Sequence, residues 1–321
     1  MATLPNLEAA VGFSRKRGVA AAALACALAL AACADGSPAA SADGFDPGTT
    51  SGPAWSMPAS ALLAPFSADA ASAGSPVIDA SHASEGYVAA SATSEARLKL
   101  QVASGDMSYN YDLPSDGTPI VAPLNMGDGA YRIRVMQNTS GNNYVELHAV
   151  DLDVTLESEF APFLRPNVFC DYDDASASTA KARELAADAA NEGDVMRDVC
   201  TWVASSITYD YDKAAELSGT SGYVPDPDET LASGTGICFD YASLSAAMLR
   251  SLGIPCKIIT GYVSPDGVYH AWNLVYADGS WTSVEFSVRA GEWSRVDLTF
   301  AAAGAGELVG DGTSYTDRYV Y

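Results

Sequence analysis

The amino-acid sequence predicts an α+β protein in which a small antiparallel β domain precedes a domain of helices followed by strands. Three observations support this fold class. From about 85 to 160 apolar residues recur at every second position, from 177 to 207 they recur at helical spacing, and beyond 256 strand-like runs return. Because the helices of the second half come before its strands, an α+β order with an antiparallel sheet is expected.

The N-terminus has the pattern of a secretory signal peptide over residues 1–32. A basic cluster at 15–17 precedes an apolar run at 18–32, which is shorter than the roughly 20 residues of a membrane-spanning helix. The run ends in LAAC (30–33), which resembles a bacterial lipoprotein box. This resemblance implies that Cys33 is lipidated, and it predicts a chain anchored on the extracellular face of the bacterial cell membrane.

Residues 33–75 are dominated by Ala, Ser, Gly, Pro and Asp, and no Lys or Arg occurs between Arg17 and Arg97. A segment of this composition buries little apolar surface, so a flexible tether is expected. Within this segment, the patch from Trp55 to Phe66 is more apolar than the rest and is a candidate for local docking.

The β domain is predicted at 76–159. In ARLKLQV (96–102) every second residue is apolar, and YRIRVMQ (131–137) repeats this alternation. NTSGNN then predicts a turn before the strand YVELHAV. The role of this domain stays open between a spacer and a ligand-binding accessory.

The second domain is predicted at 160–321. Its expected elements are helices at 177–190 and 193–207, a helix that starts near Cys238, and strands KIITGYV, YHAWNLVYA and SWTSVEF. Asp194 is a candidate N-cap of the second helix. The dipeptide Asp278-Gly279 predicts a hairpin between the last two strands.

The charge balance narrows the classes of partner. The chain carries 40 acidic and 17 basic residues, a net charge of −23. Because it has no basic stripe that would neutralise phosphates, nucleic acid is not an expected partner. The same charge disfavours adhesion to anionic lipid, so the only expected membrane contact is the N-terminal lipid.

Six cysteines occur, of which Cys26 would leave with the signal peptide. The mature chain beyond Cys33 retains Cys170, Cys200, Cys238 and Cys256. Their wide spacing, without a CxxC pair, argues against a zinc site, and neither a metal nor a cofactor is expected. A disulfide among the three cysteines other than Cys238 stays open.

Cys238 follows a Gly-Thr-Gly turn formed by Gly234 and Gly236, and a helix-like run follows it. A thiol at a helix N-terminus lies near the positive end of the dipole, which favours the thiolate, and the free N–H groups there can hold an oxyanion. On this local pattern alone, an inert core cysteine is an equal alternative.

A thiolate nucleophile needs a base, and the chain has three histidines. His82 lies at the edge of the tether and His148 on the polar side of a strand, which leaves His270, downstream of the Cys238 helix, as the best partner. Two acids compete to orient its imidazole, Glu285 in WTSVE and Asp297 in WSRVD, each four residues after a tryptophan.

The motifs GICFDYASLSAAMLRSLGIPCKIITGYV, YHAWNLVYADGSW and Trp-x-x-x-Asp-x-Thr, taken together, resemble the transglutaminase-like superfamily over residues 160–300. Members of this superfamily are papain-like cysteine enzymes with Cys, His and Asp in that order. The resemblance implies a papain-like fold, with Cys238 as nucleophile, His270 as general base and acid, and Asp297 as the orienting acid.

The chain departs from the family pattern at three points. Asn273-Leu274 stands where the family often has Asn-Glu, and Leu298 stands where it has proline after the acid. A shorter alignment would assign the acid to Glu285 instead of Asp297, and we favour Asp297.

The resemblance implies a surface-anchored cysteine enzyme that cleaves or transfers an amide acyl group through a thioester. The expected substrate is a protein, peptide or cell-wall amide. A peptidase or amidase is favoured over protein cross-linking, because nothing in the sequence identifies an amine site. The alternative is a non-catalytic domain of the same fold that binds peptide or cell-wall polymer.

Overall fold

The computed structural model describes residues 46–67, 76–265, 267–304 and 314–321. The predicted signal peptide and Cys33 lie outside these residues. The described chain divides into two compact units, one of Ala64–Phe163 with Gly219–Tyr223, and one of 46–63, Leu164–Ser218 and Val224–Tyr321. Within the described ranges, no helix has the length and apolar character needed to cross a membrane.

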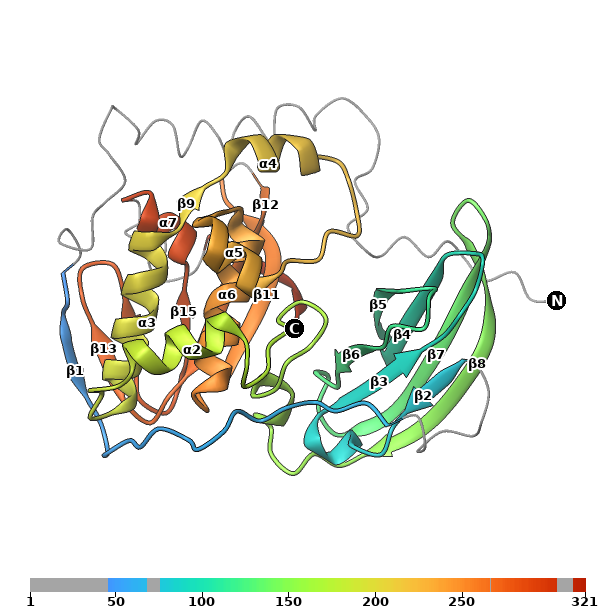
Figure 1. Cartoon of the computed structure of the whole chain (residues 1–321), viewed down its shortest axis with the longest axis horizontal. Helices are drawn as coiled ribbons and strands as arrows, with labels where there is room; N and C mark the ends of the chain where they lie inside the picture. Colours follow the sequence, from blue (N-terminus) through green and yellow to red (C-terminus); the bar gives the residue numbers. More distant parts are fainter. Residues whose placement is uncertain (1–45, 68–75, 266, 305–313) are drawn as a thin grey trace. The chain divides into compact units, whose positions relative to one another are not determined.

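The first unit is built from two antiparallel sheets (Figure 1), as the α+β prediction with a leading β domain requires. The smaller sheet has the order β2-β3-β6, from Val77–Asp79, Tyr87–Ser91 and Ile120–Pro123. The larger has the order β5-β4-β7-β8, from Met107–Leu113, Leu98–Ser104, Gly129–Ser140 and Asn143–Val154. Short 3-10 turns lie at Ala83–Glu85 and Ala161–Phe163.

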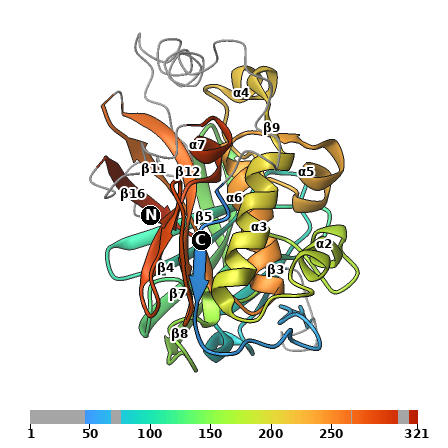
Figure 2. The same cartoon turned by 90° about the vertical axis from the view of Figure 1, so that its left-hand side faces the viewer.

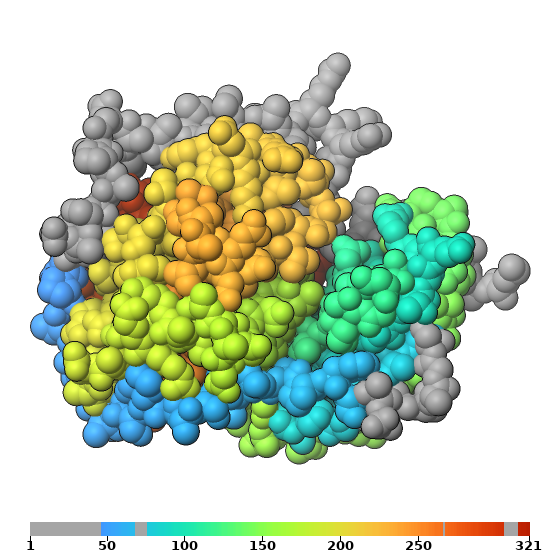
Figure 3. Space-filling view, in the orientation of Figure 1, coloured from blue at the N-terminus to red at the C-terminus, as the bar shows by residue number. Residues whose placement is uncertain are grey.

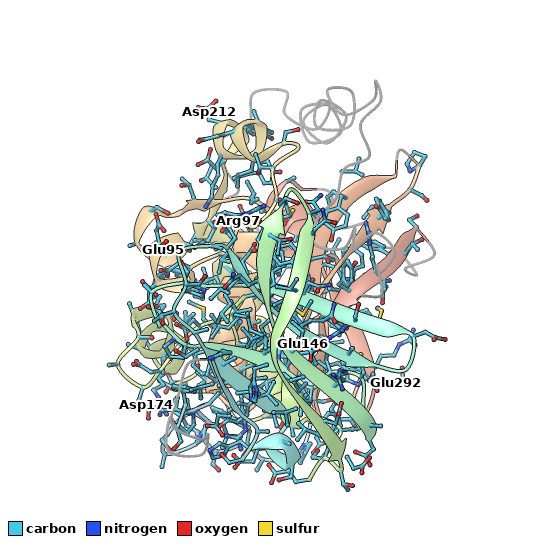
Figure 4. All side chains as sticks on the ribbon, turned by 90° about the vertical axis from the view of Figure 1, so that its right-hand side faces the viewer. Glu95, Arg97, Glu146, Asp174, Asp212 and Glu292 are labelled. Atoms are coloured by element: carbon cyan, nitrogen blue, oxygen red, sulfur yellow. The ribbon has the colours of Figure 1, made fainter. Side chains whose placement is uncertain are left out.

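The alternation seen in the sequence sorts the two faces of the larger sheet. Leu100 lies opposite Val135 on neighbouring strands, and both are fully buried. On the other face Arg132 pairs with Asp151 at 2.9 Å and with Glu146 of β8 at 3.3 Å. Figure 4 labels Glu146 on this strand. Apolar side chains therefore form the core of this unit, while paired charges occupy the opposite face.

The second unit combines six described helices with an antiparallel sheet. The helices are α2 (Ala177–Leu185), α3 (Glu192–Ser206), α4 (Tyr211–Leu217), α5 (Pro227–Ser233), α6 (Cys238–Ser251) and α7 (Leu298–Ala302). The sheet has the order β15-β12-β11-β16, from Trp293–Val296, Val268–Tyr276, Cys256–Val263 and Tyr315–Val320. Figure 2 shows α3, α5 and α6 on one side of β11, β12 and β16.

Helix α6 is the centre of this unit. Every residue from Asp240 to Ser251 is buried, because α6 packs against β11 and β12 on one side and against α2 and α3 on the other. Inside, Asn273 of β12 ties the two layers together. Its side chain donates to the Ala242 carbonyl at 3.0 Å and accepts from the Ser245 hydroxyl at 2.8 Å.

Two local predictions are corrected by the structure. The N-cap of α3 is Asn191, and Asp194 instead closes a capping box, because its carboxylate accepts from the Asn191 N–H at 3.3 Å. Asp278-Gly279 does not join a hairpin. The strand after it, β13 (Ser280–Thr282), leaves the main sheet and pairs with β1 (Thr49–Ser51) and β14 (Ser287–Val288).

The flexible tether predicted at 33–75 is wrong for residues 46–63, which lie along the second unit (Figure 3). In this segment β1 pairs antiparallel with β13, and the backbone N–H of Trp55 donates to the Ala190 carbonyl at 2.9 Å. The Trp281 indole donates to the Pro47 carbonyl at 3.1 Å. The few apolar side chains of residues 46–63 are enough to dock the segment, because the second unit supplies the apolar surface that they contact. Composition alone therefore underestimates the apolar surface that this segment buries.

Trp55→Ala is expected to lower the free energy of unfolding by about 2 kcal/mol, because the indole packs on the core of the second unit and its loss exposes apolar surface. Urea denaturation measures this difference. Leu62→Ala in the same segment is the matched control, since that side chain is 45% exposed and should change stability by no more than about 0.5 kcal/mol. Equal effects of the two substitutions would contradict the docked segment.

Candidate active site

Cys238 is the first residue of α6, and the turn before it determines its position. The short strands β9 (Thr208–Tyr209) and β10 (Thr235–Gly236) pair in parallel, and the Asp210 N–H donates to the Gly236 carbonyl at 2.9 Å. A Cβ atom at Gly236 would lie 2.6 Å from the Cβ of Asp240. Only glycine therefore allows the chain to turn into the helix at this point.

The first turn of α6 is held by Asp240, which is fully buried. Its carboxylate accepts from the Ile237 N–H at 2.8 Å and pairs with Lys213 of α4 at 2.8 Å. The helix dipole gives this N-terminus a partial positive charge, which lies beside the half-buried sulfur of Cys238. In proteins generally, helix N-termini are places where nucleophilic cysteines and oxyanion donors occur.

His270 lies on β12, opposite Gly261 of β11, and is 2% exposed. Its imidazole stacks on Phe300 with ring centroids 4.8 Å apart and on Trp272 at 6.1 Å. A side chain at Gly261 would meet the Trp272 ring at 2.8 Å, so glycine makes room for this stack. The ring is thereby confined to one orientation.

Asp297 contacts that ring directly. One carboxylate oxygen, Oδ2, lies 2.7 Å from Nε2 of His270 and accepts from the Tyr315 hydroxyl at 2.9 Å. The other, Oδ1, accepts from the Phe300 N–H at 3.1 Å and so caps α7. The carboxylate is fully buried, and each of its oxygens has a donor.

Glu285 lies elsewhere. Its carboxylate accepts from the Ser283 hydroxyl at 3.1 Å within the loop between β13 and β14. The competition between the two acids is therefore decided by contact: Asp297 is the acid that binds His270.

The electrostatics of His270 favour its protonated form. Burial lowers its pKa, but the carboxylate of Asp297 and the sulfur of Cys238 raise it by more, so the pKa lies well above its ordinary value. Its other ring nitrogen, Nδ1, is buried, and an interaction with the Cys238 side chain contributes to the raised pKa of the ring. With Nε2 engaged by Asp297, Nδ1 is the ring nitrogen that can exchange a proton with Cys238.

The three remaining described cysteines differ from Cys238. Cys170, Cys200 and Cys256 are free thiols and completely buried, so the described chain contains no disulfide among them. Burial raises the pKa of Cys170 and of Cys256 to about 12 and also raises that of Cys200. Their thiolate forms are suppressed, whereas Cys238 is partly exposed.

Sequence reasoning missed two residues of this site, Lys213 and Tyr315. Neither lies in a motif, and both reach the site only through folding. Among the described residues, no group of His, Cys, Asp or Glu side chains is arranged to hold a metal ion.

One segment of the chain matches a known protein family. Residues 179–286 match the family model of the transglutaminase-like superfamily. The chain contains a transglutaminase-like domain, and this segment belongs to that superfamily. Cys238 and His270 lie within it, and Asp297 lies beyond its end.

Two relatives match part of the chain. An uncharacterized protein of Mycobacterium leprae is 30% identical over 90 residues, which are 25% of this chain and 30% of that protein. The kyphoscoliosis peptidase of Mus musculus is 29% identical over 130 residues, 35% of this chain and 19% of the peptidase. The chain thus matches less than a third of either relative. A crystal structure of a proposed cysteine protease from Cytophaga hutchinsonii is 16% identical with a TM-score of 0.33, over 72% of this chain and 80% of that one.

Proposed function

We propose that this chain is a cysteine peptidase or amidase in which Cys238, His270 and Asp297 form a catalytic triad. The observation that carries the proposal is the buried contact of 2.7 Å between His270 and Asp297, made beside a half-exposed thiol at a helix N-terminus. This arrangement contains a nucleophile, a base and an orienting acid. One protein that the chain resembles, the kyphoscoliosis peptidase, is named as a peptidase, which supports the same reaction class.

The reaction follows from the atoms present. The Cys238 thiolate attacks the carbonyl carbon of an amide, and N–H groups of the first turn of α6 stabilise the oxyanion. The carbon–nitrogen bond then breaks as His270, the proton carrier, protonates the leaving amine, which leaves a thioester on Cys238. Water, deprotonated by His270, attacks the thioester and releases the acid and the thiol.

Attack by an amine in place of water would give acyl transfer through the same intermediate. We favour hydrolysis of a protein, peptide or cell-wall amide. The proposed location, the extracellular face of a bacterial membrane with a lipid on Cys33, rests on the N-terminal sequence alone.

The test is alkylation of the full chain by iodoacetamide near neutral pH, with the modified cysteines identified by mass spectrometry. Cys238 should react selectively, and His270→Ala should slow its reaction by about tenfold or more, because the thiolate loses its partner cation. His148→Ala removes a histidine of the other unit and should leave the rate unchanged. Absence of reaction at Cys238, or equal reaction at all four described cysteines, would favour a non-catalytic binding domain instead.

A further inference from the structure

The hydroxyl of Tyr315 shares an acceptor atom with the histidine of the proposed triad. Oδ2 of Asp297 receives the Tyr315 hydroxyl at 2.9 Å and the His270 Nε2 contact at 2.7 Å. A carboxylate can only accept, so the phenol must be the donor in this pair. Charge that the phenol withdraws from Oδ2 is no longer available to hold a proton on the imidazole.

Tyr315 is distant in sequence from Asp297 and His270, and strand pairing brings its hydroxyl to them. Tyr315 begins β16 and pairs with Val263 of β11, the strand that also pairs with β12 and so with His270. The Trp272 ring contacts it edge-on at 4.8 Å, and the Arg295 guanidinium lies 4.4 Å from its centroid. Tyr315 is only 8% exposed and lies outside the segment that matches the family model.

The phenol of Tyr315 stays protonated over the pH range in which the proposed site would work. Burial, and then the neighbouring Asp297 carboxylate, raise the pKa of Tyr315 far above its ordinary value. The titratable and charged groups that face the Tyr315–Asp297–His270 chain are Cys238 of α6 and Arg295 of β15, which also pairs with Asp317 of β16 at 3.6 Å.

We propose that Tyr315 is a positioning residue whose hydroxyl holds Oδ2 of Asp297 in place and limits how tightly His270 binds its proton. This inference rests on the proposed function, since it assigns Tyr315 to the same triad. A weaker hold on the proton helps the imidazolium deliver it to a leaving amine, while the shared acceptor keeps the carboxylate from rotating away from the ring.

The experiment is an NMR titration of the full chain labelled at histidine Cε1, with the signal of His270 assigned by its loss in His270→Ala. In Tyr315→Phe the ring and its packing remain while the donor is removed. The midpoint of the His270 titration should move to higher pH, corresponding to about threefold to tenfold tighter proton binding. Tyr269→Phe is the matched control, because it removes another tyrosine hydroxyl, adjacent to His270, whose partner is Thr260 at 2.8 Å. The midpoint of that variant should stay that of the parent chain.

A second variant guards against misfolding of the first. Incorporation of 3-fluorotyrosine in place of Tyr315 keeps the hydroxyl and makes it a stronger donor, so the His270 midpoint should move to lower pH. An unchanged midpoint in both Tyr315 variants, or the same shift in Tyr269→Phe, would overturn the inference. The titration does not depend on turnover: selective alkylation of Cys238 with an unmoved midpoint overturns the role of Tyr315 alone, whereas an unreactive Cys238 overturns the proposed function.

Discussion

Asp297→Ala is expected to slow the alkylation of Cys238 by about tenfold near neutral pH. Without the carboxylate, His270 is left buried with no acceptor on Nε2, and burial lowers its pKa. His270 of the variant therefore loses its proton at a lower pH than His270 of the parent chain. The positive charge that we propose to stabilise the Cys238 thiolate is lost with that proton. Rates of iodoacetamide labelling measured across pH report this change.

Glu285→Ala is the control, because Glu285 stands at the same spacing from a tryptophan but binds Ser283 instead of the histidine. Its labelling rate should stay within about twofold of the parent rate. Asp297→Asn separates charge from structure, since its amide oxygen can still cap α7 through the Phe300 N–H. The assignment of the acid is wrong if Glu285→Ala slows the reaction and Asp297→Ala does not.

Arg250→Met is expected to lower the free energy of unfolding by about 3–5 kcal/mol. The Arg250 side chain is fully buried and donates to three backbone carbonyls, those of Cys256 at 2.8 Å, Arg165 at 2.8 Å and Tyr321 at 2.9 Å. Methionine fills much of the volume but satisfies none of these acceptors. The chain segment before α2, the start of β11 and the C-terminal residue would lose their common anchor.

Urea denaturation of the full chain measures this loss, and Arg289→Met provides the same substitution at a side chain that is 76% exposed. Its ion pair with Glu292, at 3.6 Å, lies at the surface, so the expected change is within about 0.5 kcal/mol. A similar stability for the two variants would show that the three carbonyl contacts of Arg250 contribute nothing net.

Local patterns in the sequence predicted most of the regular structure. The two-residue period predicted the strands of the β unit, and the helical spacing at 193–207 corresponds to α3 at Glu192–Ser206. Both patterns work because each side chain's face follows from backbone geometry and does not depend on distant residues. The capping of α3 was assigned to the wrong residue, because Asn191 and Asp194 both satisfy the local rule and act together as a capping box.

Local sequence patterns do not determine which residue is the acid of the proposed triad. Glu285 and Asp297 have the same spacing from a tryptophan, so spacing alone cannot separate them. Strand pairing does: β15 pairs with β12 through Val296 and Asn273, which brings Asp297 next to His270. β13 instead pairs with β1, and the chain that carries Glu285 leaves with it.

By itself, the sequence determined the α+β class, the main helices and strands, and the candidate cysteine and histidine, because these follow from periodicity, turn chemistry and residue type. Only the tertiary structure decided that residues 46–63 are docked, that Asp297 contacts the histidine, and that Tyr315 joins it. The physical reason is that each of these contacts joins segments far apart in the chain, and which partner a strand or side chain meets depends on the packing of the whole unit.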